Sequence, residues 1–210
     1  LVPSTSLLER FDLDGRFLGS VHMALESVPA GGVDPSDFVL TQSGDLCLLD
    51  RAGARVLLFD REGRFLTDWS AGEAGVARPE APNALALDQE GTVWMLDPAA
   101  GLVRSYDRRG ASGRSFPFGE GLPPRASAAA LLAVLDSWVV VAATDASWIR
   151  FFDFRGEFLF QGEFPTWRGV AAGDLESDSE DRLFLARAAA GEIASLRVLV
   201  DPERGPGRRP

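Results

Sequence analysis

The sequence lacks lysine and contains one histidine and one cysteine among its 210 residues. Without lysine, the chain cannot form a side-chain Schiff base or supply the lysine of a phosphate-binding loop. A single histidine, His22, excludes zinc sites built from several imidazoles. A single cysteine, Cys47, excludes a disulfide within the chain, and its apolar surroundings in "LCLLD" are typical of a buried thiol.

Positive charge and long apolar runs are also scarce. The net charge is −10 with an isoelectric point near 4.6, which repels phosphate backbones and argues against a nucleic-acid partner. No apolar run reaches the roughly 18 residues of a transmembrane helix, so we expect no membrane-spanning segment in this chain. Its length suits one domain with one sizeable core.

Common catalytic motifs are missing as well. Neither Gly-x-Ser-x-Gly, Cys-x-x-Cys nor a Gly-x-Gly-x-x-Gly loop occurs, which argues against a nucleophile elbow, a dithiol site and a dinucleotide cofactor. His22 lies close to Ser20 but without the local context of a catalytic triad, and we expect it to be a surface or loop imidazole.

A short motif, aromatic-Asp-x-x-Gly, is repeated instead. It begins at Phe11, Phe59, Tyr106 and Phe152, at intervals of 48, 47 and 46 residues. A period in the forties is typical of propeller blades. Within each motif the glycine can adopt a positive φ and the aspartate can bind backbone amides, so the motif predicts a tight hairpin turn.

The residues between the motifs read as short strands. Apolar runs opened by turn formers occur at 44–50, 91–97, 136–143 and 180–186, each preceded by another apolar segment. One unit therefore predicts four antiparallel strands. We expect an all-β chain, with residues 1–200 forming one β-propeller of four or five blades and residues 201–210 forming a mobile tail rich in Pro, Gly and Arg. An incomplete six-bladed ring is the alternative.

Two further expectations follow from the repeat. Segments 126–135 and 185–199 are rich in Ala and Leu and would be helical on propensity alone, but the register of the repeat predicts strands there. If the ring closes, the N-terminal "RFLGSV" is expected to complete the blade that contains "RLFLA" and "LRVLV", because closure removes exposed strand edges.

The repeat unit resembles the NHL repeat, most closely at Pro82–Phe116 and nearly as well at Ser36–Trp69. The third unit departs from the pattern at Ala142 and Ala143, and the fourth lacks the aromatic-Asp hairpin. The resemblance implies a propeller, and similar propellers include amidating lyases, lactonases and arylesterases that hold a metal in or near the central channel. The histidine shortage argues against the amidating-lyase type of site.

Two metal sites can be considered on oxygen ligands alone. The resemblance implies a channel site at strand entrances, where Asn83 and Asp37 are the candidate ligands, while Ser127 or Ala128 and Arg168 occupy the later entrances. In "GDLESDSEDR", Asp174, Glu176 and Asp178 alternate as in calcium loops. However, Ser179 and Leu185 replace the glycine and glutamate that such loops need, so this stretch predicts a solvated hairpin loop. No cofactor is expected, with Ca²⁺ as the alternative.

Exposed tryptophans are common at binding interfaces, and Trp69, Trp148 and Trp167 fall at strand ends or in loops. Packing in the core is the alternative for them. The first functional prediction is a non-catalytic protein-binding propeller, an accessory or scaffold subunit of a larger extracytoplasmic or membrane-attached complex. A calcium-dependent lactonase-like or lyase-like enzyme and a glycan- or ligand-binding module are the alternatives. Leu1 in place of Met is compatible with removal of a signal peptide or anchor, and equally with a sequence that represents only part of the protein.

Overall fold

A computed structural model gives the fold. It describes residues 6–12, 14–29, 32–72, 77–122, 130–145, 147–162, 172–178, 182–187 and 192–197, and the structural statements below concern these residues. The predicted tail and the first residues of the 126–135 segment lie outside them.

The described chain is almost entirely strand. Three four-stranded antiparallel blades follow one another, with strands in spatial order along each sheet. Blade 1 contains β3 (Pro35–Leu40), β4 (Leu46–Asp50), β5 (Arg55–Phe59) and β6 (Phe65–Ser70). Blade 2 contains β7 (Ala84–Leu87), β8 (Val93–Asp97), β9 (Leu102–Tyr106) and β10 (Ser112–Pro117). Blade 3 contains β11 (Ala130–Val134), β12 (Val139–Ala143), β13 (Ile149–Phe152) and β14 (Phe158–Gly162).

Two smaller sheets flank these blades. Blade 4 is three-stranded, with β15 (Asp174–Ser177), β16 (Arg182–Arg187) and β17 (Glu192–Arg197). The N-terminal hairpin pairs β1 (Leu7–Phe11) with β2 (Phe17–His22). The short helix η1 (Leu25–Ser27) is the one helix in the described part of the chain, and no helix there is long and apolar enough to cross a membrane.

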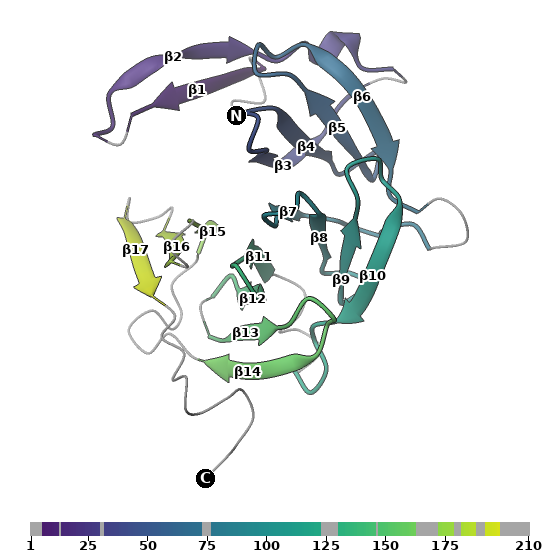
Figure 1. The fold of residues 1–210 in the computed structure, drawn as a ribbon, viewed down its shortest axis with the longest axis vertical. Helices are drawn as coiled ribbons and strands as arrows, with labels where there is room; N and C mark the ends of the chain where they lie inside the picture. The colour runs from purple at the N-terminus through teal and green to yellow at the C-terminus, as the bar shows by residue number, and fades with distance from the viewer. Residues whose placement is uncertain are drawn as a thin grey trace.

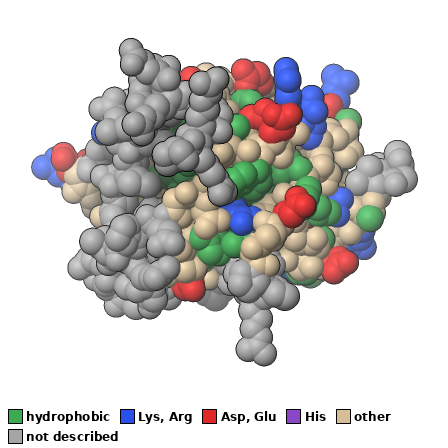
Figure 2. Space-filling model, turned by 90° about the horizontal axis from the view of Figure 1, so that it is seen from below, with side chains coloured by type: hydrophobic (Ala, Val, Ile, Leu, Met, Phe, Trp, Pro, Cys, Tyr) green, Lys and Arg blue, Asp and Glu red, His purple; other side chains and the backbone are tan. Residues whose placement is uncertain are grey.

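The sheets are arranged around a common centre (Figure 1). The first strands of successive blades, β3, β7, β11 and β15, contact one another near this centre, while β6, β10 and β14 lie at the periphery. Apolar clusters fill the spaces between adjacent blades, for example Trp94 and Phe116 of blade 2 against Phe152 of blade 3. Edge-on, the outer surface shows hydrophobic side chains among acidic and basic ones (Figure 2).

The repeated motif forms the hairpin between the third and fourth strands, as predicted. In all four copies the aspartate Oδ1 accepts backbone N–H bonds from the second and fourth residues after it, for example from Glu62 and Arg64 to Asp60. The motif glycine has a φ of 77° to 87°. This left-handed conformation favours glycine, because a Cβ would be strained there.

The same glycines also bring neighbouring blades close together. A Cβ added to Gly110 would meet Trp69 of blade 1 at 2.6 Å, and one added to Gly156 would meet Phe116 of blade 2 at 2.5 Å. The motif turn of each of these blades is therefore seated on the fourth strand of the preceding blade. The repeat serves packing between blades as well as the turn itself.

The two segments with helical propensity form strands. β11 lies within 126–135 and is buried along its whole length, and β16 and β17 occupy most of 185–199. β11 pairs in full register with β12. Burial between two blades and a complete hydrogen-bond ladder outweigh the small differences in intrinsic propensity among Ala, Leu and Val.

The expected closure by the N-terminal segment is wrong for the described residues. β2 pairs with β1, and these two strands form a sheet separate from β15–β17. The hairpin is instead held against blade 1, where Met23 and Val28 join a buried cluster with Leu48 and Phe59. The Ala24 N–H also donates to the Gly63 carbonyl. The hairpin thus takes the place of the outer strands of a blade that precedes blade 1.

Candidate functional site: a pocket over an acidic channel

One end of the ring is formed by the turns that follow each first strand. In blades 1, 2 and 4 these turns begin at Thr41, Asp88 and Asp178, and the first residue donates its N–H to the carbonyl of the fifth. Blade 3 makes a tighter turn between Leu135 and Trp138. Because the strands alternate in direction, the motif turns lie at the same end of the blades.

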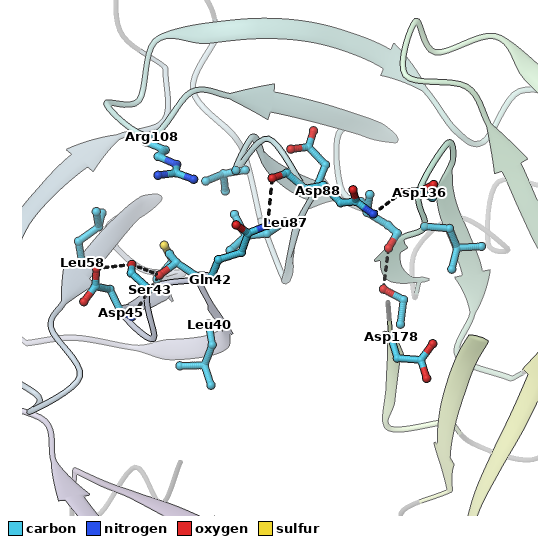
Figure 3. A pocket seen from close by; sticks show the side chains of 18 of the residues that line it. Leu40, Gln42, Ser43, Asp45, Leu58, Leu87, Asp88, Arg108, Asp136 and Asp178 are labelled. Atoms are coloured by element: carbon cyan, nitrogen blue, oxygen red, sulfur yellow. Dashed lines mark hydrogen bonds between the residues drawn. The ribbon is translucent and has the colours of Figure 1, made fainter. Parts of the chain in front are cut away.

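A pocket of about 560 Å³ lies at this end, and residues from all four blades line it. Its apolar wall includes Leu40, Leu58 and Leu87, and its carboxylates come from the turns (Figure 3). The acidic residues are Asp45, Asp88, Asp136 and Asp178, whereas Arg108 is the one basic residue among the described lining residues. We call this cavity the mouth pocket.

Two glutamines link the blades along the mouth pocket. The Gln42 Nε2 donates to the Gln89 carbonyl at 3.2 Å, and the Gln89 Nε2 donates to the Asp136 carboxylate. These partners are 47 residues apart in each case, so the sequence period appears directly as a hydrogen bond between blades. The sequence shows that Gln42 and Gln89 are separated by one repeat period, but it does not predict that they lie at the pocket.

A second cavity of about 370 Å³ lies deeper, between the first strands of the four blades. It shares Leu40, Leu87, Val134 and Ser177 with the mouth pocket, so the two cavities adjoin. We call it the channel pocket.

Three carboxylates line the channel pocket: Asp37 from β3 and Asp174 and Glu176 from β15. Asp37 and Asp174 are equivalent, since each lies four residues before the turn of its blade. The positions equivalent to Glu176 in blades 2 and 3 are Ala86 and Ala133, which also line the cavity. The channel pocket is thus acidic on the side of blades 1 and 4 and apolar on the side of blades 2 and 3.

The protein around these carboxylates raises their pKa values. Desolvation by burial raises the pKa of Asp37 to about 7, against hydrogen bonds from Leu85 and Phe38, and the charge of Asp174 adds to the rise. Desolvation, followed by the charges of Asp174 and Asp37, raises the pKa of Glu176 to about 7. Desolvation also raises the pKa of Asp174. Asp37 is half-buried. Asp174 and Glu176 have exposed surface, but enough protein surrounds their carboxylates to disfavour the ionised forms.

The Glu176→Gln variant is expected to be more stable than wild type at about pH 8 and equally stable at about pH 4. With a folded-state pKa of about 7 against an ordinary value of 4.5, the stability associated with protonated Glu176 is fully present below pH 4.5 and is lost as pH rises through 7. Because the side chain is exposed, the gain at the higher pH is expected to be only about 1 kcal/mol. Thermal unfolding across this pH range measures it.

Glu157→Gln is the matched control, because Glu157 is exposed on the β13–β14 hairpin and lines neither pocket. It is expected to leave the pH profile unchanged. Equal stability of Glu176→Gln and wild type at every pH would show that the channel does not disfavour the ionised carboxylate.

The structure separates the two residues predicted for a channel metal. Asp37 lines the channel pocket, but Asn83 is not among the lining residues of either pocket. Its Nδ2 donates to the Ala130 carbonyl at 3.1 Å and so links blades 2 and 3. Ser127, Ala128 and Arg168 lie outside the described residues. Among the described side chains, no group of three or more His, Cys, Asp or Glu residues is arranged to hold a metal ion.

The hairpin-loop prediction for the acidic stretch is wrong at residues 174–177, which form β15. Leu175 is buried, and the alternation of the strand directs Asp174 and Glu176 to the channel side. Asp178 begins the following turn, where its Oδ2 accepts a hydrogen bond from Arg182 at 2.6 Å. Two candidate sites that were predicted separately therefore contribute carboxylates to one cavity.

The predicted tryptophan interface is corrected at both described positions. Trp148 is buried and stacks near Phe118. Trp69 is also buried, packs against Tyr106 with ring centroids 5.0 Å apart, and contributes to the wall of the mouth pocket. The core alternative applies because both rings fill space within or between blades. Trp167 lies outside the described residues.

Comparison with solved structures decides the fold. A virginiamycin B lyase from Staphylococcus aureus matches with a TM-score of 0.59 at 11% identity, over 93% of this chain and 64% of that one. A protein of unknown function from Bacteroides caccae matches with a TM-score of 0.59 at 17% identity, over 92% and 72% of the two chains. The β-propeller domain of Cps50 (Swd1) from Myceliophteria thermophila matches with a TM-score of 0.55 at 13% identity, over 80% and 54%. The chain is a β-propeller.

These similarities extend to the fold alone, since every identity is low. The propeller spans less than two thirds of the length of the lyase structures. No protein-family model and no curated protein sequence matches it, so NHL-type membership stays a prediction. The comparison therefore shows the fold, and the function has to be argued from the site.

Proposed function

We propose that this propeller is a non-catalytic binding module that holds a basic segment of a partner protein over its mouth pocket. The observation that carries the proposal is the convergence of Asp37, Asp174 and Glu176 in a channel pocket that adjoins the larger mouth pocket. An arginine or lysine side chain of the partner would place its charged group among these carboxylates.

The charge of the whole chain supports a basic partner. At −10, the protein attracts cations at long range, and a cleft lined by one sign of charge concentrates that field. Binding would also relieve the repulsion among the three channel carboxylates, because a guanidinium or ammonium group favours their ionised forms. A cationic side chain is therefore expected to bind more strongly among these three carboxylates than at isolated surface carboxylates.

Exposed leucines beside the pocket support a protein segment over a small cation. Leu40 and Leu66 both line the mouth pocket and are 56% and 54% exposed. Such apolar surface is stabilised when a partner chain covers it. The combination of an apolar rim and an acidic centre suits a peptide with both basic and aliphatic residues.

The finer proposal concerns the setting: an accessory or scaffold subunit of an extracytoplasmic or membrane-attached complex. A rigid ring that displays turns from several blades on one face is suited to that role. Fractionation of native cells, followed by isolation of the complex that contains this chain, tests it. Recovery of the full-length protein in the cytoplasm as a free monomer would contradict it.

A fluorescent tetra-arginine peptide is expected to bind the protein, with an affinity that falls about tenfold in the Asp174→Asn/Glu176→Gln double variant. The loss follows from removing two of the three channel carboxylates while leaving Asp37, whose Oδ2 accepts the Leu85 N–H, in place. Fluorescence anisotropy at fixed ionic strength measures the affinity.

The control is Glu9→Gln/Glu157→Gln, which changes the net charge equally at two exposed positions outside both pockets. This variant is expected to bind tetra-arginine nearly as well as wild type. Equal losses in the two double variants would show that the attraction is nonspecific, and the proposed site would be abandoned.

A calcium-dependent enzyme is the second candidate, and the same three carboxylates are the observation that favours it. Calcium binding would require them to move together, since the described residues hold no ready group of ligands. Calorimetric titration with Ca²⁺ discriminates the two functions. A calcium-dependent rise in thermal stability that is lost in the Asp174→Asn/Glu176→Gln variant would favour the enzyme.

A further inference from the structure

The N-terminal hairpin is built as the outer half of a blade. The motif turn joins β1 to β2, as it joins the third and fourth strands of blades 1 to 3, and β1 lies on the inner side of β2 (Figure 1). The ring contact beside the turn is also kept, since Phe11 and Phe17 have centroids 5.7 Å apart. Phe59 and Phe65 of blade 1 are separated by the same 5.7 Å. In blades 1 to 3 the third strand pairs on its inner edge with a second strand, whereas in the described part of the chain β1 pairs with β2 alone.

The motif aromatic of the hairpin is uncovered. Phe11 is 55% exposed, whereas its counterparts in blades 1 to 3 are at most 2% exposed. In each of these blades an apolar residue of the second strand lies directly opposite the motif aromatic and belongs to the same buried cluster. The three pairs are Leu46 with Phe59, Val93 with Tyr106 and Val139 with Phe152. The complete blades therefore show what covers such an aromatic: an apolar strand that runs antiparallel to the third strand.

The inner edge of β1 also presents backbone hydrogen-bonding groups. The Met23 N–H donates to the Ser6 carbonyl at 2.8 Å. Because hydrogen-bonded and non-hydrogen-bonded pairs alternate along an antiparallel ladder, Leu7 and Glu9 direct their N–H and C=O groups away from β2. A strand edge of this kind accepts an added strand from another chain.

Charge decides which strand fits this edge. Glu9 and Arg10 are adjacent in β1, and both are exposed. Opposite charges directly across a strand pair stabilise it, and like charges destabilise it. A second copy that pairs through a two-fold axis, with Leu7 opposite Phe11, would place Glu9 opposite Glu9. The charges of β1 therefore disfavour another β1 and favour a different strand with complementary charges.

We propose that β1 binds an extended segment of another protein as a second strand, and that this segment reads apolar-acidic-basic-apolar-apolar. The segment runs antiparallel to β1, as β4 runs to β5. Its first residue covers Phe11, its acidic residue lies opposite Arg10 and its basic residue opposite Glu9. Its last two residues lie opposite Leu8 and Leu7. Because β1 lines neither the mouth pocket nor the channel pocket, this site is separate from the proposed function above.

The experiment uses two synthetic peptides of equal composition. The matched peptide contains Val-Asp-Arg-Val-Val between short Gly-Ser flanks, and the swapped peptide contains Val-Arg-Asp-Val-Val between the same flanks. Binding to the full chain is followed through the backbone amide NMR signals of β1. The matched peptide is expected to shift these signals in a saturable manner, and the swapped peptide to bind about tenfold more weakly because both of its charges face like charges.

The Glu9→Arg/Arg10→Glu variant leaves the net charge unchanged and is expected to reverse this preference, so that the swapped peptide binds about tenfold more tightly than the matched one. The control is Arg155→Glu/Glu157→Arg, which exchanges two exposed charges on the β13–β14 hairpin. It is expected to retain the wild-type preference.

Equal binding of the two peptides, or β1 signals that neither peptide shifts, would overturn the proposal, since Glu9 and Arg10 would then only guard the edge against pairing. Dimerisation of the protein through β1 would assign the edge to a second copy and would overturn it as well. If the charge-reversed variant does not fold, Phe11→Ala decides the question, because that side chain is largely exposed. It is expected to weaken binding of the matched peptide about fivefold, and an unchanged affinity would contradict the site.

Discussion

The Gly110→Ala variant is expected to lose about 3 kcal/mol of unfolding free energy, which for a chain of this length lowers the midpoint of thermal unfolding by about 6–12 °C. Two effects act together. The φ of Gly110 is +83°, where a Cβ is strained, and the added methyl group would lie 2.6 Å from Cγ and Cδ2 of Trp69. That ring is buried between blades and cannot move aside without disturbing Tyr106.

Gly44→Ala separates the two effects. Gly44 also has a φ of +83°, but no neighbouring atom lies within 4 Å of the position that an added Cβ would take. This variant is expected to lose only about 1 kcal/mol, the cost of the backbone strain alone. Equal losses at positions 44 and 110 would contradict the close seating of the blade 2 turn on blade 1.

The Asp97→Ala variant is expected to lose about 3–5 kcal/mol, the largest effect predicted for a single side chain. Asp97 ends β8 and is fully buried. Its carboxylate accepts N–H bonds from Glu80, Ala81 and Ala100, and so ties the entrance of blade 2 to the turn between its second and third strands. Alanine would leave these three donors without their partner, and chemical denaturation measures the loss.

The Asp97→Asn variant keeps one carbonyl oxygen as an acceptor. Its loss of unfolding free energy is therefore expected to be about half that of Asp97→Ala. A loss below about 1 kcal/mol in Asp97→Ala would show that solvent or other groups can satisfy the three N–H donors. The equivalent residue in blade 3 is Ala143, which illustrates that a blade can form without this carboxylate when its first three strands are buried.

The propeller could be predicted because its signals are local and repeated. Asp60 and Gly63 lie within one turn, so their hydrogen bonds and backbone conformation are properties of a few consecutive residues. The interval of about 47 residues then places one such hairpin in each blade that carries the motif. Even β11, with its helical composition, was assigned correctly because the repeat fixed its register.

The channel carboxylates could be predicted only in part. Asp37 was recognised at a strand entrance, but Asp174 and Glu176 were assigned to a loop because the acidic run masks the alternation around the buried Leu175. Their proximity to Asp37 depends on the first strands of blades 1 and 4 facing one cavity, which is a property of the ring.

The burial of Trp69 could not be predicted from the sequence for a similar reason. Whether Trp69 is buried depends on Gly110, in the next copy of the motif, which allows the neighbouring turn to approach. The position of β2 could not be derived either, since one hairpin motif suits both the expected closure and the observed packing against blade 1.

The pH dependence of tetra-arginine binding tests the acidic channel most directly. Asp37 and Glu176, with pKa values of about 7, are ionised at pH 8 and protonated at pH 5. The wild-type affinity is therefore expected to fall about tenfold between these values, and the Asp174→Asn/Glu176→Gln variant to show a much smaller change. An affinity that is the same at both pH values, or higher at pH 5, would contradict binding of a cationic partner by the channel carboxylates.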